Sequence, residues 1–247
     1  SPLVASGLAE ETGIKYTREF DRILNAVLRK IGFDKVFSTG TGSDVMISEI
    51  TGELRKRLEE KHGNPLFISA CPSWVKYAEQ FMPEILPNLS TVKPAQQITG
   101  ALIKTLVAEE TKVKPEKIYS VSVTPCMAMK FEARRDGMTR KGISDVDSVL
   151  TVRELARLIR LYGIDMTNVE SEPADEPMGE RSSLAALSEA SGGIAEGVIR
   201  SLIYSFFKTE SEKQLFKKIR SAASFRESTF QIGELIINVA VVDGLTG

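Results

Sequence analysis

The chain has 247 residues, of which 42% are hydrophobic and 26% are charged, a composition typical of globular proteins that excludes a disordered or fibrous chain. Its 32 basic and 33 acidic residues give a net charge of -1, and no basic run dominates one stretch, so no nucleic-acid partner is expected. The longest apolar runs, such as residues 235–242, are far shorter than the ~20 residues of a membrane-spanning helix, and no signal-peptide pattern opens the chain. We therefore expect an intracellular, cytoplasmic protein without a membrane partner.

Apolar spacing predicts alternating helices and strands in the first part of the chain. A helix is expected over 20–31, where Gly32 ends it, and a second helix over 47–63. Short strands are expected at 35–38 and 66–69, with Cys71 directly after the second, and further helices are expected to begin at Pro72 and Pro94. The one histidine, His62, is expected as a solvated residue at the end of a helix, which leaves almost no material for a histidine-dependent catalytic arrangement.

The second part of the chain continues the alternation. A strand over 118–123 ends at Thr124, Pro125 and Cys126, so this cysteine has the same setting as Cys71. Thr151 and Glu154 form a capping-box pattern that predicts the start of another helix after a short strand at 148–150. The remaining elements are expected to be a surface loop over 170–180, an apolar helix after Gly192-Gly193 through Phe207, a charged helix over 209–220 and a final buried strand over 236–242.

Strands that alternate with helices predict an α/β fold, with parallel sheets covered on both faces. At this length we expect two lobes of parallel β-sheet flanked by helices, residues 1–110 and residues 111–247, within one domain overall. Ligands of such folds bind beyond the carboxyl ends of the strands, which is where both cysteines are expected. The predicted binding site is a cleft between the lobes.

The two cysteines are the residues most suited to carry chemistry. They are 55 positions apart, so no CxxC motif supports a self-contained metal site, and two cysteines cannot form a disulfide framework. Each stands beside a proline, which fixes the local backbone and so the direction of the sulfur. Three interpretations stay open at this point: metal ligands, small buried apolar residues, or a disulfide pair.

The segments around both cysteines resemble the cluster motifs of the large subunit of iron-only (FeFe) hydrogenases. Residues 67–75, around Cys71, are similar to the first motif, and residues 124–132, around Cys126, are similar to the second. The resemblance covers essentially the whole chain in the expected order. It continues in the segments 87–91, 94–97, 145–151, 153–156 and 191–193, and in Ser1 with Pro2.

This resemblance implies a cofactor. The family holds a four-iron (4Fe-4S) cluster on four cysteines, one of which bridges to a diiron unit that carries carbon monoxide and cyanide, and Cys71 and Cys126 match two of the four. The other two would follow the strand that ends at Val242, and the chain stops at Gly247, so we expect the cofactor to be absent or incomplete in this chain. The positions that the resemblance places beside the cofactor are Pro2, Ala70, Gln96, Thr124, Pro125 and Met129.

Departures from the family pattern affect the expected proton path. The family's proton-donating cysteine is replaced by Ala70, and its next carboxylate aligns with Ile50, although Glu49 is adjacent. Ser90 and Glu53 match the outer members of the path, and each could equally be an ordinary surface polar residue.

Further departures concern the diiron pocket. Met129 stands where a cyanide-binding lysine is expected, and Lys130, one position later, should point elsewhere. Leu3 replaces a cyanide-binding serine, and Ser188 and Glu189 replace an aromatic residue and a glycine.

Three functions follow from the resemblance and its departures. The first is reversible oxidation of H2 by the parent protein, slow because Ala70 has no proton to donate. The second is a hydrogen or redox sensor that uses the same cluster, and the third is a non-catalytic protein of iron–sulfur assembly. The expected partners are an electron-transfer protein or domain such as ferredoxin and flanking domains of the parent chain, whereas the isolated chain is expected to be metal-free and inactive.

Overall fold

The chain forms two compact units, each built from two separate stretches of sequence. The computed structural model describes the chain except residues 18, 62, 180–181, 210, 212 and 245–247, so the expectation for His62 lies outside the described residues. Unit 1 comprises Ser1–Gly42 and Lys93–Ser182, and unit 2 comprises Ser43–Val92 and Ser183–Gly247. The boundary expected at residue 110 does not coincide with this division, because residues on both sides of it belong to unit 1.

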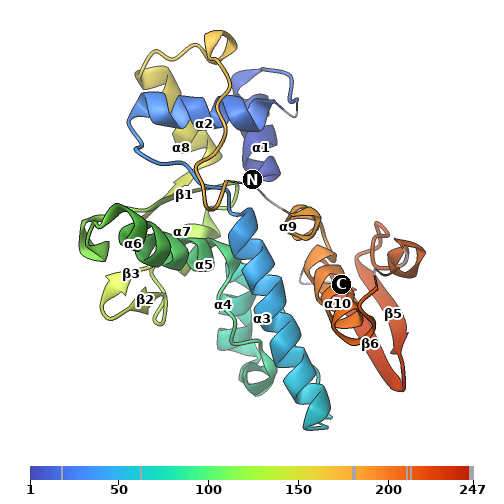
Figure 1. The fold of residues 1–247 in the computed structure, drawn as a ribbon. Helices are drawn as coiled ribbons and strands as arrows, with labels where there is room; N and C mark the ends of the chain where they lie inside the picture. The colour runs from blue at the N-terminus through green and yellow to red at the C-terminus, as the bar shows by residue number, and fades with distance from the viewer. Residues whose placement is uncertain (18, 62, 180–181, 210, 212, 245–247) are drawn as a thin grey trace. The chain divides into compact units, whose positions relative to one another are not determined.

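Unit 1 contains helices α1, α2 and α8 together with a small parallel sheet (Figure 1). No helix of the described part of the chain is long and apolar enough to cross a membrane. The elements of unit 1 are α1 (Pro2–Thr12), α2 (Phe20–Ile31), α5 (Ala95–Leu102), the π-helix η2 (Ile103–Val107), α6 (Ala108–Thr111), η3 (Pro115–Lys117), β1 (Val121–Thr124), α7 (Ala128–Glu132), β2 (Thr139–Arg140), β3 (Ile143–Ser144), β4 (Ser148–Thr151), α8 (Val152–Leu161) and η4 (Met166–Asn168).

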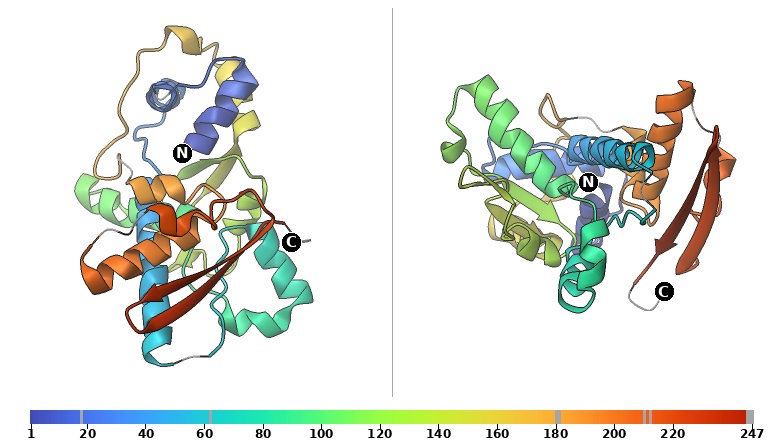
Figure 2. Two further views of the ribbon diagram at one scale, coloured as in Figure 1. Left: turned by 90° about the vertical axis from the view of Figure 1, so that its right-hand side faces the viewer. Right: turned by 90° about the horizontal axis from the view of Figure 1, so that it is seen from below.

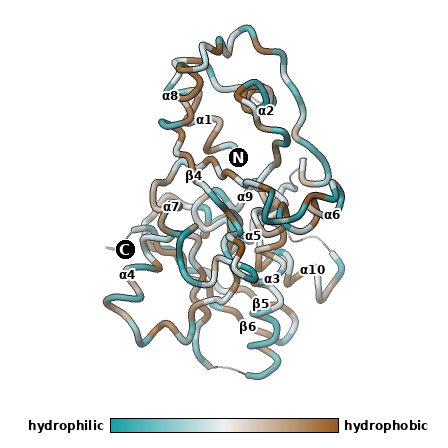
Figure 3. The backbone as a smooth tube through the Cα atoms, turned by 90° about the vertical axis from the view of Figure 1, so that its left-hand side faces the viewer, coloured by the Kyte–Doolittle hydropathy of each residue, from teal (hydrophilic) through white to brown (hydrophobic). Residues whose placement is uncertain are grey.

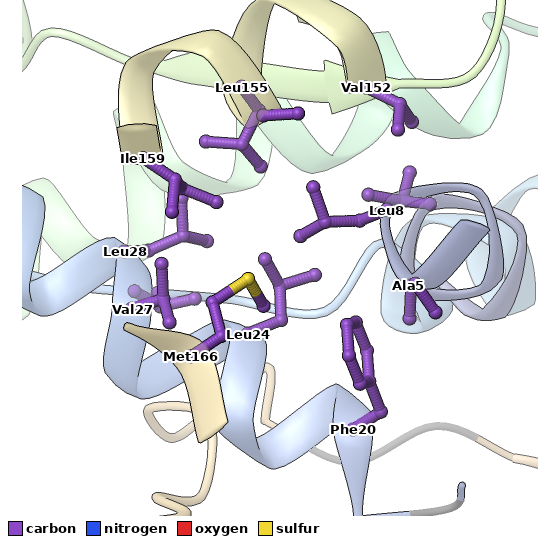
Figure 4. Packing of buried hydrophobic residues seen from close by; sticks show 14 residues of the cluster. Ala5, Leu8, Phe20, Leu24, Val27, Leu28, Val152, Leu155, Ile159 and Met166 are labelled. Carbon is purple, nitrogen blue, oxygen red and sulfur yellow. The ribbon is translucent and has the colours of Figure 1, made fainter. Parts of the chain in front are cut away.

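The core of unit 1 lies where α1, α2 and α8 meet. Leu8, Leu24 and Leu155 point toward one another from the three helices, and Phe20 and Met166 close the cluster (Figure 4). The predicted capping box fixes the start of α8, because the Thr151 hydroxyl accepts from the Glu154 amide while the Glu154 carboxylate accepts from the Thr151 amide. Hydrophobic and hydrophilic residues alternate along α8 (Figure 3). The buried ones, Val152, Leu155, Ala156 and Ile159, recur at helical spacing and so lie on one side of the helix, which faces the core.

Strands β1 and β4 pair in parallel and confirm the predicted α/β class for unit 1. Val121 pairs with Ser148 and Thr124 with Thr151, so β1 ends immediately before Pro125 and Cys126. The other pair in this unit, β2 with β3, is a short antiparallel one.

The strand predicted at 35–38 does not form. The Val36 amide donates to the Asp175 carboxylate at 2.7 Å and the Asp175 amide donates to the Val36 carbonyl at 2.7 Å. Arg29 on α2 also binds Asp175 and Glu172, at 2.7 and 2.6 Å. The described part of the predicted surface loop, residues 170–179, is irregular, and it satisfies backbone groups of Val36 that a neighbouring strand would have bonded.

Unit 2 combines helices with an antiparallel hairpin. Helix α3 begins in unit 1 and continues through unit 2, and β5 and β6 pair along their whole length, from Phe225 with Val242 to Ile232 with Leu235. The hairpin is drawn as two long arrows in Figure 2. The elements are α3 (Gly40–Glu59), α4 (Pro72–Phe81), η1 (Pro83–Asn88), α9 (Ser183–Leu187), α10 (Gly193–Phe207), η5 (Lys213–Phe216), β5 (Phe225–Ile232) and β6 (Leu235–Val242).

Two predictions for the end of the chain are wrong. The charged helix over 209–220 is reduced, in its described part, to the short η5, because Phe216 and Ile219 insert into the core against Leu202 of α10. The final strand is present but is not buried as a whole, since β6 is half of a hairpin in which Ile237 faces the core and Ile236 is 68% exposed. The apolar helix predicted through Phe207 is confirmed as α10.

The segment before Cys71 makes only a local parallel contact. Phe67 and Leu89 form an isolated parallel bridge, in which the Phe67 amide donates to Asn88 and the Ser90 amide donates to Phe67. The strand predicted at 66–69 is therefore shortened to this bridge, because no further partner pairs with it among the described residues. The bridge nevertheless holds the Cys71 segment beside the segment that carries Ser90.

We expect the core assignment on α8 to be testable by a matched pair of truncations. Leu155→Ala should lower the free energy of unfolding by about 2–5 kcal/mol, because Leu155 is 0% exposed in the three-helix core. Leu161→Ala, on the same helix but at a position that is 72% exposed, should change it by less than about 0.5 kcal/mol. Urea unfolding followed by circular dichroism measures both, and equal losses would contradict this packing.

Candidate functional site

Cys71 stands at the N-cap position of α4 in unit 2. Its amide donates to the Ser69 hydroxyl at 3.1 Å, and its carbonyl accepts from the Val75 amide at 3.1 Å. Pro72 takes the first helical position, where its missing N–H costs no hydrogen bond. The thiol is exposed and free. The backbone of Cys71 is thus fixed on both sides while its side chain stays accessible.

Cys126 has the same local structure in unit 1. Its amide donates to the Thr124 hydroxyl at 3.2 Å, and its carbonyl accepts from the Met129 amide at 3.2 Å as the chain turns toward α7. Thr124 is buried at the end of β1, and Pro125 stands directly before the cysteine. The thiol is free and partly exposed. Both cysteine amides thus donate to a hydroxyl two residues earlier, but the predicted setting just past a strand is confirmed for Cys126 only, because the segment before Cys71 forms only the bridge at Phe67.

The donor set fits part of an iron–sulfur ligand set. Each unit has one accessible thiol on a backbone that is fixed by hydrogen bonds. This suits a thiolate ligand, because a fixed backbone restricts the directions that the sulfur can take. A four-iron cluster takes four cysteine thiolates, and no group of three or more histidine, cysteine, aspartate or glutamate residues in the described part of the chain could hold a metal ion by itself. Cys71 and Cys126 therefore fit as two of several ligands, and neither forms a site alone.

Ser90 and Glu53, predicted as outer members of a proton path, are directly hydrogen-bonded. The Ser90 hydroxyl donates to the Glu53 carboxylate at 2.6 Å, and Arg57, one turn further along α3, lies 3.5 Å from the same carboxylate. The nearby Ile50 is buried, whereas Glu49 is exposed. The structure thus brings the serine and the glutamate together, while Glu49 does not take the buried position that Ile50 occupies.

Gln96 lies at the centre of a buried polar network in unit 1. Its side-chain carbonyl accepts from the Ser122 hydroxyl of β1 at 2.8 Å. Its amide nitrogen donates to the Met129 carbonyl at 3.3 Å and to the Glu132 carboxylate at 3.1 Å. Gln96 therefore joins α5 to β1 and to the backbone that follows Cys126, so it fixes the course of the Cys126 loop, which we define as residues 124–130.

The Lys130 side chain is directed to α8. Its ammonium pairs with Glu154 at 2.5 Å, and Glu154 is the capping-box residue of α8. The hydrogen bonds from Lys130 and from Thr151 lower the pKa of Glu154 to about 2. The prediction that Lys130 is directed elsewhere is confirmed, and Met129 leaves no cation at its own position.

The remaining predicted positions have simpler surroundings. Pro2 is the first residue of α1, and Leu3 beside it is exposed. Ala70 is half-buried between Ser69 and Cys71 and carries only a methyl group. The Ser188 hydroxyl donates to the Ala185 carbonyl at 2.7 Å, and Glu189 is half-buried nearby.

The Gly192-Gly193 turn requires glycine for steric reasons. Gly192 has φ +76°, and a Cβ on Gly193 would lie 1.6 Å from the Leu187 carbonyl oxygen. The preceding Ser191 is bonded to Asp243 and Arg226, which fastens this turn to the ends of the hairpin strands in unit 2.

Sequence reasoning missed Glu132 as a separate functional group. It closes the second motif, but nothing in the sequence distinguishes it from a surface glutamate of a short helix. The structure buries it to 2% exposure beneath Gln96 and Gln97, which lie far away in the chain. Burial raises the pKa of Glu132 to about 7, and the hydrogen bonds from Gln97 and Gln96 and the charge of Arg135 only partly oppose this rise.

This shift predicts how stability depends on pH. The carboxyl ionises near its ordinary pKa of 4.5 in the unfolded chain and near 7 in the folded chain, so its stabilising effect is complete below pH 4.5 and is lost as the pH rises through 7. The glutamine side chain of the Glu132→Gln variant cannot ionise. Relative to the wild type, its free energy of unfolding should therefore rise by up to about 3 kcal/mol between about pH 5 and pH 8.

Urea unfolding at several pH values measures this difference. Glu154→Gln is the matched control, because the pKa of Glu154 is about 2 and its ionisation lies below the pH range used. The difference between this control and the wild type should be constant over the range, and a constant difference for Glu132→Gln would contradict the prediction.

The chain is similar to known proteins along most of its length. A family model described as the iron only hydrogenase large subunit, C-terminal domain, matches residues 1–247. Iron hydrogenase 1 of Clostridium pasteurianum is 36% identical over 244 residues, which cover 99% of this chain and 42% of that protein. The cytosolic iron-sulfur assembly component 3 of Mus musculus is 32% identical over 237 residues, which cover 90% of this chain and 49% of that protein.

Solved structures agree with the family model. An apo FeFe-hydrogenase from Chlamydomonas reinhardtii matches with a TM-score of 0.79 and 29% identity, over 94% of this chain and 58% of that one. This likeness confirms the predicted α/β fold class. The chain spans about half the length of the curated relatives it matches, 42% and 49% for the two named above. The chain belongs to the iron-only hydrogenase large-subunit family, as the motifs around Cys71 and Cys126 predict.

Proposed function

We propose that the chain is the cluster-binding part of a hydrogenase-type protein that oxidises H2 reversibly and slowly. The observation that carries the proposal is the common structure of the two cysteines. In each, a hydroxyl two residues earlier accepts the cysteine amide and a following amide donates to the cysteine carbonyl. Two free thiols whose backbone amides are fixed in the same way are suited to serve as ligands of one kind.

The cofactor and the protein have separate tasks in this proposal. When bound, the iron–sulfur cluster with its diiron unit would supply the redox centre at which H2 is converted into protons and electrons. Cys71 and Cys126 would hold it as two of its thiolate ligands. Gln96 positions the Cys126 loop through the Met129 carbonyl, at 3.3 Å. These residues bind and orient, and none of them moves a proton.

Proton transfer is the step that this chain supports poorly. Ala70 precedes the ligand Cys71 and has neither a donor nor an acceptor in its side chain. Further out, the hydrogen bond of 2.6 Å between Ser90 and Glu53 is a contact along which a proton can pass, because the carboxylate accepts from the hydroxyl. The outer path is retained in this proposal, and its inner donor is missing.

Restoring the donor tests the proposal. In the full-length parent protein with its complete cofactor, Ala70→Cys should raise H2 turnover at neutral pH by about 10²-fold or more, which is the usual contribution of a positioned proton-transfer group. Ser73→Cys places a thiol two residues beyond Cys71 and should leave the rate unchanged. The proposal fails if the wild-type protein already turns over as fast as a standard hydrogenase.

Removing a ligand tests the cluster assignment. Cys71→Ala or Cys126→Ala in the full-length protein should each lower the bound iron and the visible absorption of the cluster at least severalfold, since each removes one of four thiolates. Ser73→Ala, on the first turn of α4, should leave the iron content unchanged. Iron analysis and absorption spectroscopy measure this, and full iron occupancy in both cysteine variants would refute the assignment.

Two other functions are separable from this one. Slow chemistry suits a hydrogen or redox sensor, in which the state of the cluster is reported to a partner domain, and Ala70 is consistent with that. A non-catalytic iron–sulfur carrier is favoured by the 32% identity to the cytosolic iron-sulfur assembly component 3 of Mus musculus, which also supports a cytosolic location. Infrared bands of iron-bound carbon monoxide and cyanide would exclude the carrier, and their absence from the fully matured protein would exclude the hydrogenase and the sensor.

A further inference from the structure

Glu132 is a buried carboxyl that the proposed chemistry does not use. It ends α7, is 2% exposed, and accepts hydrogen bonds from two amide side chains, Gln96 at 3.1 Å and Gln97 at 3.5 Å. Carboxylates are almost never fully buried without a paired cation, because a desolvated charge is costly. Helix α5, which carries both glutamines, thus contributes two neutral donors to this carboxyl.

The same amides connect the carboxyl to the Cys126 loop. The Gln96 nitrogen that donates to Glu132 also donates to the Met129 carbonyl at 3.3 Å. The Met129 amide in turn donates to the Cys126 carbonyl at 3.2 Å. Three successive hydrogen bonds therefore lead from the Glu132 carboxyl to the backbone of Cys126, all within unit 1.

We propose that Glu132 is a positioning residue for Cys126: its carboxyl takes up and releases a proton inside unit 1, and Gln96 passes the change to the Cys126 loop. In the ionised form the carboxylate accepts from both glutamines. In the protonated form Oε1 can still accept, and the O–H on the other oxygen is a new donor that needs an acceptor. Gln97 supplies one, since its side-chain oxygen is buried and has no hydrogen-bond partner within the described ranges.

The charges around Glu132 favour a proton equilibrium near neutral pH. Arg135 is the charged group whose field acts on the carboxyl, and it is outweighed by burial, so the pKa rises to about 7. Strand β4, which packs against α7, consists of uncharged residues, and β1 and α5 present Ser122, Gln96 and Gln97. Lys130 on α7 is neutralised by Glu154 at 2.5 Å.

A proton equilibrium inside this network changes the loop without any metal. Protonation of the second carboxyl oxygen, Oε2, adds a donor and removes the negative charge from Oε1, so Glu132 attracts the Gln96 amide less strongly and the hydrogen bond of Gln96 to Met129 gains weight. We expect the Cys126 loop to have two states that exchange around pH 7 in the metal-free chain. This inference concerns the loop itself, and only its meaning for a bound cluster rests on the proposed function.

Nuclear magnetic resonance of the metal-free chain tests the proposal. The backbone amides of Cys126 to Lys130 are followed from about pH 5 to about pH 9 in a His62→Gln background, which removes the one histidine and its own titration near neutral pH. These amides should shift with a common midpoint near pH 7. The added substitution Glu132→Gln should abolish the midpoint.

Two further variants separate positioning from simple structural support. Glu154→Gln breaks the Lys130 contact of the same helix but should keep the midpoint, because the pKa of Glu154 lies at about 2. Arg135→Gln should move the midpoint to higher pH, since it removes the charge that opposes protonation of Glu132. This variant leaves the buried network in place and serves if Glu132→Gln does not fold.

The outcomes are distinct. Loss of the midpoint in Glu132→Gln, or its upward movement in Arg135→Gln, supports the proposal. A midpoint that persists in folded Glu132→Gln, that stays at the same pH in Arg135→Gln, or that is missing from the His62→Gln parent overturns it. Because no metal is used, failure of this experiment leaves the proposed function untouched, and failure of the iron analysis leaves this one untouched.

Discussion

The hydrogen bond from each cysteine amide to a hydroxyl two residues earlier is the constraint on which the candidate site depends. Ser69 supplies it for Cys71 and Thr124 for Cys126, at 3.1 and 3.2 Å. A short polar side chain that bonds the backbone in this way makes a turn without help from a strand or helix. The cysteines are therefore fixed locally, and a helix can begin directly after each turn without disturbing the thiol.

What differs between the two cysteines is the support behind the turn. Behind Cys71 lie the isolated bridge between Phe67 and Leu89 and the hydrogen bond between Ser90 and Glu53. Behind Cys126 lies a buried network of amides and one carboxyl, centred on Gln96. A buried polar network fixes the positions of its side chains only when every donor and acceptor in it has a hydrogen-bond partner. Within the described residues the side-chain oxygen of Gln97 has no hydrogen-bond partner, and it is the acceptor that the proposed protonated form of Glu132 would use.

The departures from the family pattern affect different tasks. In the proposed function Ala70 lacks a proton donor and Met129 lacks a cation, whereas the backbone carbonyl of Met129 is bound by Gln96. Lys130 has become part of the structural contact with the capping box of α8. Positioning groups are thus retained where reactive groups are not, which agrees with slow chemistry at a preserved framework. Because positioning groups and reactive groups differ in this way, cluster binding and H2 turnover need separate experiments.

The sequence by itself determined the fold class, the family, and the strand before Cys126 and the helix start at Pro72 after Cys71, because these depend on short-range patterns. Apolar spacing located α2 and α10, Thr151 with Glu154 located the start of α8, and a proline beside each cysteine indicated a fixed backbone. Only the tertiary structure decided the composition of the two units, the hairpin of β5 with β6 and the burial of Glu132. These features arise from contacts between residues far apart in the chain, such as Val36 with Asp175 and Gln96 with Glu132, and local patterns carry no record of such contacts.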